Sequence, residues 1–340
     1  AVLRLRSTMK ERDIRPADLL QRYLELSAQD ADLCFGGVPR YEIACVACGA
    51  SGSTHQFVKN GFDYASCTVC GTLFQSPRPS IAAYETFYRD SESSRYWAEV
   101  FFPAVAEARR EHIFRPRAER LSGLCRDKGI LVERLIEIGA GYGIFLDEWR
   151  CLSPKTELVA IEPSASLAAH CASKGFVVEE TIAEKLSGYV GHADLVVCFE
   201  VLEHVHDPLS FLKALSRLAR PGGYVFVSTL CADGFDIQVL WEASNSIFPP
   251  HHINFLSVAG VECVFGRAGL MDVEVSTPGK LDVDIVRNAA AKQPDVLEGQ
   301  RFVRKLVEND ELGAAFQTFL VENRLSSHAW AIGRRPAEIN

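Results

Sequence analysis

The sequence predicts an α/β fold in which a largely parallel sheet is covered by helices on both faces. From about residue 130, short apolar runs alternate with helical stretches, and a glycine-rich turn joins the first run to its helix. Ahead of this part lie a cysteine-rich segment and an aromatic helical segment. We therefore divide the chain into a helical lead-in, a zinc-ribbon module, a helical lid and the α/β domain, at 1–40, 41–76, 77–125 and 126–340.

The bulk composition is typical of a soluble globular protein. The 340 residues carry a formal net charge of -8, and 48% of them are hydrophobic, enough for a full core. No apolar run reaches the roughly 20 residues that span a bilayer, and the start of the chain lacks the apolar core of a secretory signal. We expect a cytoplasmic protein without a membrane partner. The acidic balance also argues against a large nucleic-acid footprint, which needs clustered basic side chains.

The first expected element is the helical lead-in. Apolar side chains recur there near helical spacing, at Leu19, Leu20, Tyr23, Leu24 and Leu26. We expect this helix to serve packing rather than chemistry.

Residues 41–76 contain two cysteine pairs with metal-binding spacing. Cys45 and Cys48 form the first pair, Cys67 and Cys70 form the second, and eighteen residues separate them. A glycine follows each pair and lets backbone N–H groups turn towards the sulfurs. Four thiolates complete the tetrahedron of Zn²⁺ and leave no site for water, so the ion would be structural. Four unrelated thiols and an iron–sulfur centre are the alternatives; the remaining seven cysteines are expected to be reduced.

Residues 77–125 are rich in aromatic side chains and then in arginine. One interpretation is an amphipathic helix pair with its charges in water; the other is a lid that receives an anionic substrate. The stretch SESSRYW has the polarity of a turn between two helical stretches. If the segment is a lid, we expect substrate contacts from Tyr88, Ser94, Arg95 and Tyr96.

The α/β domain follows as a regular succession of elements. Its predicted strands are 131–139, 157–164, 176–181, 193–201, 224–230, 271–277 and 327–335. Its predicted helices are 144–152, 165–175, 207–223 and 261–269, with a polar helical region at 290–324. This alternation predicts a parallel sheet buried between helices.

The glycine-rich turn contains Gly139, Gly141 and Gly143. A P-loop would need Gly-Lys-Ser/Thr, which is missing from this turn. A dinucleotide-binding turn would need a third glycine where this chain has Ile144, and it does not use an acid such as Glu137 two residues before the first glycine. Both common phosphate-binding interpretations are therefore disfavoured.

An acid, then Gly-x-Gly-x-Gly, then a helix resembles the first motif of class I S-adenosylmethionine-dependent methyltransferases. The resemblance covers about residues 130–275 and the last strand. It implies a Rossmann-like seven-stranded methyltransferase sheet whose last strand is reversed. It also implies that the methionine part of S-adenosylmethionine lies along the bare backbone of the turn, and that Glu137 holds the amino group of the ligand.

Later motifs resemble the same family in the same order. Glu162 ends the second strand twenty-one residues beyond Gly141, where a carboxylate can accept both ribose hydroxyls. The family frames adenine at the positions of Thr181 and Ile182. The stretch ADLVVCFEVLEHV is similar to its fourth-strand motif, which implies that Phe199 and Glu200 lie beside the cofactor.

Methyl transfer to an alcohol requires a base, and histidine is the usual candidate near neutral pH. His204 follows the fourth strand. The segment FPPHHINFLS follows the fifth strand, where α/β sheets place substrate contacts. We expect His252, then His251, then His204 to be candidates for the base, and Asn254 to contact substrate. In the alternative interpretation, the histidines cap backbone groups. No catalytic metal is expected, because the sequence shows no carboxylate cluster to bind one.

The zinc module ahead of this core is similar in outline to bacterial sugar C-methyltransferases. Because only about 65 residues follow the core in this sequence, we do not expect their extra C-terminal domain, and we expect O- or N-methylation rather than C-methylation. We expect an enzyme that methylates a small molecule such as a sugar, nucleotide-sugar or surface-glycan precursor, with a homodimer as an open alternative.

Two other functions stay open at this stage. One is an RNA methyltransferase that grips RNA with the zinc module; the acidic charge and the single lysine of 41–76, Lys59, count against it. The other is a non-catalytic S-adenosylmethionine-binding module. The complete set of cofactor motifs counts against this second alternative, although a motif alone does not prove turnover.

Overall fold

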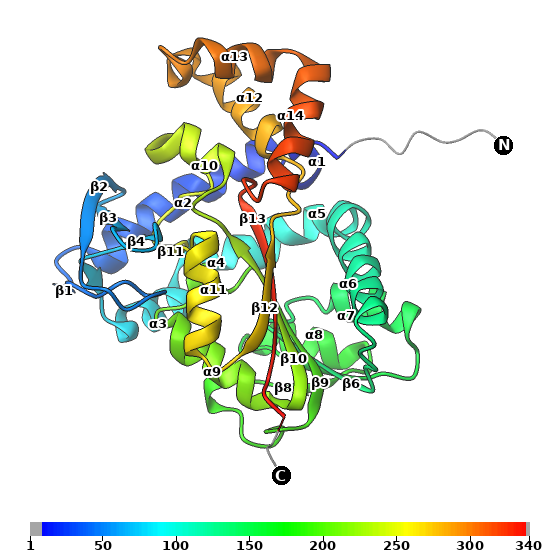
Figure 1. Ribbon diagram of the computed structural model, residues 1–340. Helices are drawn as coiled ribbons and strands as arrows, with labels where there is room; N and C mark the ends of the chain where they lie inside the picture. The colour runs from blue at the N-terminus through cyan, green and yellow to red at the C-terminus, as the bar shows by residue number, and fades with distance from the viewer. Residues whose placement is uncertain (1–8, 338–340) are drawn as a thin grey trace.

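A computed structural model describes residues 9–337 and contains a seven-stranded sheet with helices on both faces (Figure 1). The strand order is β12-β13-β10-β9-β6-β7-β8. Strand β13 runs antiparallel to β10 and β12, whereas β10, β9, β6, β7 and β8 pair in parallel. The seven predicted strands and the reversed last strand are thereby confirmed. Their bounds are β6 Arg134–Ile138, β7 Glu157–Ile161, β8 Val177–Glu179, β9 Ala193–Phe199, β10 Ala219–Leu230, β12 Met271–Ser276 and β13 His328–Arg334.

The central strands are apolar because both faces of the sheet are covered. All seven residues of β9 are buried, whereas the edge strand β12 alternates between exposed and half-buried positions. Helices α6, α7 and α8 contribute to the apolar core on one face, and α9 and α11 contribute to that on the other. Their bounds are α6 Arg115–Asp127, α7 Ile144–Leu152, α8 Ala165–Ser173, α9 Pro208–Leu218 and α11 Val258–Arg267.

One helix boundary differs from its prediction. Helix α9 ends at Leu218, before the Pro-Gly-Gly turn at which the sequence places its end. Strand β10 already begins at Ala219, which pairs with Ala193 before the register shifts across the turn. The Pro-Gly-Gly stretch therefore forms an irregularity within the strand and not the cap of the helix.

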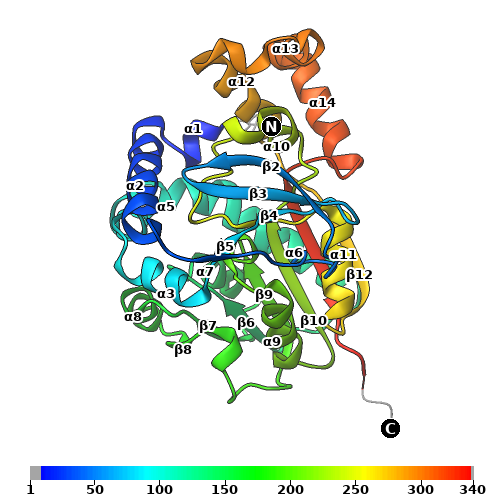
Figure 2. The same cartoon turned by 90° about the vertical axis from the view of Figure 1, so that its left-hand side faces the viewer.

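The cysteine-rich segment forms a small antiparallel sheet whose last strand comes from far along the chain (Figure 2). Strand β11 pairs with β4 and gives the order β11-β4-β3-β2. Because β11 lies inside FPPHHINFLS, this pairing holds the histidine segment against the module. The division of the chain into separate domains stays a prediction. The bounds are β1 Arg40–Tyr41, β2 Ser53–Lys59, β3 Phe62–Cys67, β4 Leu73–Gln75, β5 Arg78–Pro79 and β11 Asn254–Phe255.

The helical lead-in is confirmed within the described residues, while its residues 1–8 lie outside them. The predicted turn in SESSRYW is wrong, because only Ser91 precedes helix α4. The Ser91 hydroxyl accepts a hydrogen bond from the backbone N–H of Ser94. The Asp30 carboxylate accepts hydrogen bonds from the backbone N–H groups of Glu92 and Ser93. These acceptors cap the start of helix α4. Two π-helical turns, Trp97–Phe101 and Arg110–Phe114, flank α5. The helix bounds are α1 Glu11–Ile14, α2 Ala17–Phe35, α3 Ile81–Asp90, α4 Glu92–Tyr96 and α5 Phe102–Arg109.

The predicted polar helical region forms a helical cap at one end of the sheet (Figure 1). Its helices pack on α10 around an apolar cluster of their own. They begin earlier than predicted, at Asp282. No helix within residues 9–337 is long and apolar enough to cross a membrane. The bounds are α10 Phe235–Leu240, α12 Asp282–Lys292, α13 Arg301–Glu308 and α14 Asp310–Glu322.

Candidate active site

The glycine-rich turn joins the end of β6 to the start of α7. Gly139, Gly141 and Gly143 have φ angles of 71°, 53° and 65°. Residues that carry a Cβ rarely adopt this backbone conformation. A Cβ on Gly139 would lie 2.8 Å from a methyl group of Val201, whereas one on Gly141 would meet no atom of the described residues within 4 Å. The turn therefore presents bare backbone to open space at Gly141, where an extended ligand can lie along it.

Two buried acids flank this turn. Glu137, on β6, is 3% exposed, and one of its oxygens has no hydrogen-bond partner among the described residues. Its burial raises the pKa of the carboxyl group well above its usual value. Glu162 follows β7, and its carboxylate accepts from the N–H of Gly141 at 2.8 Å and of Ser164 at 2.9 Å. Glu162 thereby fixes the turn, and Glu137 offers a buried acceptor to a ligand donor.

Thr181 and Ile182 lie just after β8, at the rim of this region. The chain there is tied to Glu162, because Glu162 donates its N–H to the carbonyl of Glu179. Ile182 is 36% exposed. Phe199 instead packs in the core, with its ring 4.4 Å from that of Phe145. The predicted adenine-framing residues thus lie beside the predicted ribose acid.

Glu200, at the end of β9, is the centre of a charged network. It has a φ of 55° and binds Arg117 at 3.0 Å, His328 at 3.1 Å and the hydroxyl of Ser228. Burial alone would raise the pKa of Glu200, but His328 and Arg117 outweigh burial and hold it well below its usual value. Arg117 is 4% exposed. The interpretation that the charged side chains of residues 77–125 lie in water is therefore wrong for Arg117.

The three candidate histidines come together at this end of the sheet. The rings of His204 and His252 lie 4.7 Å apart, and the ring of His251 bonds the hydroxyl of Ser93 at 2.9 Å. Nδ1 of His204 lies 2.9 Å from the carbonyl of His251, and Nδ1 of His252 lies 2.6 Å from that of Ser246. The contacts to carbonyls agree with the alternative that the histidines cap backbone groups. Burial lowers the pKa of His204 to about 4 and those of the other two well below their usual values.

A carboxylate joins the histidines, which the sequence did not predict. Glu203 is 1% exposed and accepts from the hydroxyl of Thr229 at 2.9 Å. Burial, and then the charge of Glu200, raise the pKa of Glu203 to about 8. Ligand atoms of Glu203, His204 and His252 all lie within 4.8 Å of one another. One carboxylate and two imidazoles suit a divalent cation, and imidazoles held through the other ring nitrogen are typical of metal ligands.

The predicted substrate residues separate into two groups. The Tyr88 hydroxyl lies 3.1 Å from Nδ1 of His204 and donates to the carbonyl of His251 at 3.1 Å, so Tyr88 joins the histidines. Arg95 is exposed and pairs with Glu92, and Tyr96 packs on a separate apolar cluster with Tyr23.

Asn254 is wholly buried, unlike a residue that faces a ligand. Its amide donates to the carbonyl of Val205 at 2.7 Å and accepts from Arg78 at 3.0 Å. Both ends of the amide are therefore used within the protein, and this geometry gives Asn254 the role of tying β11 in place.

The four predicted zinc ligands form one cluster. Their sulfur atoms lie within 4.8 Å of one another, with Cys45 and Cys70 at 3.6 Å and Cys48 and Cys67 at 3.5 Å. Tetrahedral Zn²⁺ with bonds of about 2.3 Å would hold its sulfurs about 3.8 Å apart. Burial raises the pKa of Cys45 and Cys48, whereas at Cys67 backbone N–H groups outweigh burial and lower the pKa to about 7. A bound cation would favour the thiolate form of all four cysteines. The cluster fits a closed metal site.

Comparison with known protein families finds a match over half of the chain. The family described as "Methyltransferase domain" matches residues 105–275.

Two curated relatives share a name. The chain is 36% identical over 114 residues to the ubiquinone biosynthesis O-methyltransferase of Escherichia coli O127:H6, a match that covers 32% of this chain and 48% of that protein. It is 36% identical over 110 residues to the protein of that name from Sodalis glossinidius, covering 31% and 44% of the two chains. The chain thus spans about half the length of the curated relatives it matches.

Solved structures of similar shape share little sequence. A SAM-dependent methyltransferase from Thermotoga maritima, described as a possible histamine N-methyltransferase, is 20% identical with a TM-score of 0.43, covering 70% of this chain and 99% of its own. The plantazolicin methyltransferase BamL, in complex with a triazolic desmethylPZN analog and SAH, is 14% identical with a TM-score of 0.49, covering 74% of this chain and 94% of its own.

Proposed function

Because the chain belongs to the methyltransferase domain family, and is an S-adenosylmethionine-dependent methyltransferase, we propose that it methylates an oxygen or nitrogen atom of a small molecule. The observation that carries this proposal is the succession of groups along one edge of the sheet. The bare glycine turn after β6 is followed by the Glu200 network after β9 and by the histidine group beside it. A cofactor on the turn would thus deliver its methyl group towards titratable side chains.

For the cofactor, we propose one role for each part of the turn region. The backbone of Gly139, Gly141 and Gly143 lies along the methionine part, and the unpartnered oxygen of Glu137 accepts from its ammonium group, directly or through water. Glu162 accepts the ribose hydroxyls, which its remaining lone pairs allow, since it already accepts two backbone N–H groups. Thr181 and Ile182 frame adenine, and Glu200 closes the site from β9, while Phe199 supports it from the core.

For acceptor activation, we propose that the cluster of Glu203, His204 and His252 receives the acceptor hydroxyl or amine. The lowered pKa of His252 keeps its imidazole neutral at pH 7, and because Nδ1 contacts the Ser246 carbonyl, Nε2 is the nitrogen left to accept a proton. A second possibility is carried by the geometry of the three ligand atoms. A divalent cation held there would lower the pKa of the acceptor group. Tyr88, which contacts His204, would border the acceptor in either case.

For the acceptor itself, a sugar, nucleotide-sugar or surface-glycan precursor stays our working proposal, with a structural zinc ion in the four-cysteine cluster. The competing proposal is an RNA acceptor gripped by the zinc module. The charge of the chain disfavours it, because RNA binding needs clustered cations and the net charge is -8. A homodimer stays a prediction.

The test is a labelling experiment. The purified protein is incubated with methyl-labelled S-adenosylmethionine and an extract of its source organism that contains both small molecules and macromolecules, and the label is then fractionated. We expect label in a small-molecule fraction; label in a ribonuclease-sensitive fraction would favour the RNA proposal, and no labelled product would favour a non-catalytic module. Gly139→Val is the negative variant, since its side chain would meet Val201, and Gly266→Ala on α11 is the matched control, since a Cβ there meets no described atom.

A further inference from the structure

A cavity lies on the β10 and β13 side of Glu200, away from the glycine turn. We propose that this cavity binds the acceptor, and that the acceptor carries an acidic group, a carboxylate or phosphate, on an apolar body. The inference rests on the proposed function and narrows its acceptor, because an acidic compound with an apolar body takes the place of a neutral sugar.

The position of the cavity links it to the reacting centre. Arg117 and His328, which both bind Glu200, lie in its wall. Ser246, whose carbonyl holds His252, lies in the wall as well. The cavity is therefore connected through these three residues to the end of β9 and to the histidine group, although Glu200 and the histidines of that group do not themselves line it. The cavity has a volume of about 160 Å³, room for on the order of ten water molecules, which suits an acceptor of one or two rings.

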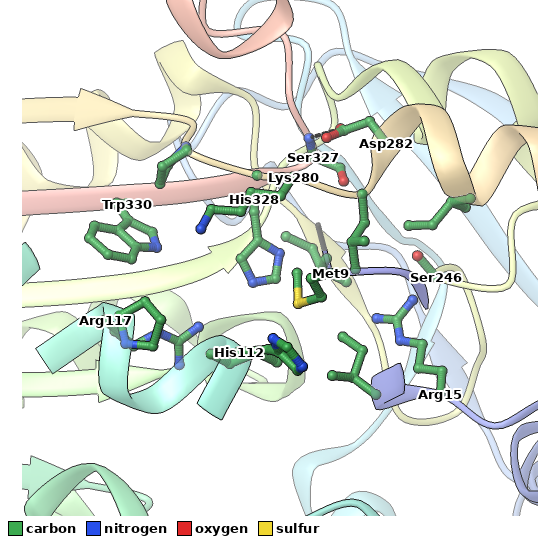
Figure 3. A pocket seen from close by; sticks show the side chains of 18 of the residues that line it. Met9, Arg15, His112, Arg117, Ser246, Lys280, Asp282, Ser327, His328 and Trp330 are labelled. Carbon is green, nitrogen blue, oxygen red and sulfur yellow. Dashed lines mark hydrogen bonds between the residues drawn. The ribbon is translucent and has the colours of Figure 1, made fainter. Parts of the chain in front are cut away.

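Basic side chains surround the cavity. Figure 3 shows Arg15, His112 and Arg117 on one side and Lys280 and His328 on the other. Arg120 also lines the cavity. Arg120 and Lys280 have no carboxylate within salt-bridge distance among residues 9–337. In a chain with a net charge of -8, such a concentration of cations indicates an anionic ligand.

The acid in the described part of the wall is already used. Asp282 accepts from the Ser326 hydroxyl at 2.6 Å, the Ser327 N–H at 2.6 Å and the Gln317 amide at 2.7 Å. These donors hold its carboxylate within the protein, so it is not available to neutralise Arg120 or Lys280. The described wall thus carries several basic side chains and no free carboxylate, a balance that favours an anionic ligand.

The cavity wall also has an unused donor. Nε of Arg117 is buried without a hydrogen-bond partner among the described residues, although another nitrogen of the same guanidinium binds Glu200. Arg117 is 4% exposed and lines the cavity. Its guanidinium therefore brings a buried, unpaired N–H group to the wall, which an anion would satisfy.

The rest of the wall is apolar, which limits the kind of anion. The guanidinium of Arg120 lies 4.8 Å from the ring centre of Trp330. A neutral sugar would place hydroxyl groups against these surfaces without partners, at a cost in free energy. An acid with a flat or apolar body would satisfy both parts of the wall. The apolar lining residues are Met9, Ile14, Ile113, Pro116, Leu230, Pro278, Leu281, Ile285 and Trp330.

The test compares two ligands of the same shape. Calorimetric titration of the purified protein with 2-naphthoate and with the neutral 2-naphthamide isolates the contribution of the charge. We expect naphthoate to bind at least tenfold more tightly than the amide. Lys280→Gln and Arg120→Gln should each weaken naphthoate binding about three- to tenfold and leave amide binding unchanged. Lys213→Gln, on α9 and outside the cavity, is the matched control and should change neither.

Binding of S-adenosylhomocysteine to the same preparations separates the two proposals. If S-adenosylhomocysteine binds but naphthoate does not, or binds no better than the amide, the inference is overturned and the proposed function stands. The inference is also overturned if Lys213→Gln weakens naphthoate binding as much as Lys280→Gln does. If S-adenosylhomocysteine fails to bind, the proposed function fails, whatever naphthoate does.

Discussion

At the scale of single residues, Glu162 shows how one carboxylate serves both the fold and the site. It accepts two backbone N–H groups, one of them from the glycine turn. Its remaining lone pairs would accept hydrogen bonds from the ribose hydroxyls. The negative charge of Glu162 should therefore affect the affinity for the ligand more than the stability of the fold.

We predict that Glu162→Gln weakens S-adenosylhomocysteine binding at least tenfold, because charge-assisted hydrogen bonds to two hydroxyls would become neutral ones. Isothermal titration measures this effect. Glu184→Gln, an exposed acid after β8, is the control and should bind normally. Equal affinities of the two variants would remove Glu162 from the cofactor site.

The histidine group gives a second prediction at this scale. His252→Ala and the more conservative His252→Gln should lower kcat by about 100-fold or more, the usual range for loss of a catalytic proton acceptor, and should leave S-adenosylhomocysteine binding intact. The exposed His192, changed to Ala, is the control. A normal kcat in both His252 variants would place the base elsewhere.

Chelation then separates a base from a metal-assisted step. If Glu203, His204 and His252 hold a divalent cation, dialysis against a chelator should abolish turnover and added Mg²⁺ or Mn²⁺ should restore it. The melting temperature is followed in parallel to show that the four-cysteine cluster has kept its ion. Turnover that survives chelation would leave the imidazole as the base.

At the scale of elements, the main finding is that a strand from the α/β part of the chain completes the sheet of the cysteine-rich segment. Strand β11 follows the two histidines directly and pairs with β4. The guanidinium of Arg267, on α11, donates to the carbonyl of Ala47 between the first two cysteines. Ordering of the four-cysteine module and placement of the histidines are thus physically coupled.

We predict that Cys45→Ser and Cys70→Ser each release one zinc ion per chain and lower the melting temperature by at least about 5 °C. Loss of a structural ion removes folding free energy, and about 1 kcal/mol shifts the melting temperature of a chain of this size by about 2 °C. Because β11 would lose its partner strand, kcat should fall as well. Metal analysis and calorimetry measure these effects.

Cys263→Ser is the matched control for the zinc prediction, since Cys263 lies outside the cluster. Zinc that stays bound in both cluster variants would contradict the proposed ligand set.

Lys59, at the end of β2, gives a prediction about pH. Its ammonium donates to the carbonyl of Ser244 at 2.8 Å, and burial lowers its pKa to about 8. Between about pH 8 and 10.5, the unfolded chain binds more protons at this lysine than the folded chain does, so this group makes stability rise with pH. The difference in unfolding free energy between wild type and Lys59→Met should therefore shift in favour of wild type across this interval. Urea titrations measure it, with the exposed Lys155→Met as control; a constant difference would contradict the prediction.

At the scale of the whole molecule, the sheet places three separate features of the candidate site along one edge. The glycine turn follows β6, the Glu200 network follows β9, and the cavity lies against β10 and β13. The helical cap of α12 to α14 and the lead-in helices close this edge from above (Figure 1). Because carboxyl ends of parallel strands meet at one edge, loops distant in sequence converge there.

The sequence by itself determined the features that depend on local pattern. Alternating apolar runs predicted the seven strands, the Gly-x-Gly-x-Gly motif predicted a turn of bare backbone between the first strand and its helix, and paired cysteines predicted their own cluster. These signals are local because strand periodicity, turn conformation and short ligand spacing involve residues within a few positions of each other.

Only the tertiary structure decided which distant side chains meet. Arg117 reaches Glu200 across 83 residues, β11 joins a sheet formed mostly by residues 53–75, and the cavity gathers cations from both ends of the chain. Asn254, which we expected to contact the substrate, is instead buried, and its side chain joins β11 to the carbonyl of Val205 through a hydrogen bond. Such contacts depend on how helices and strands pack in three dimensions, and this packing leaves no periodic pattern along the sequence.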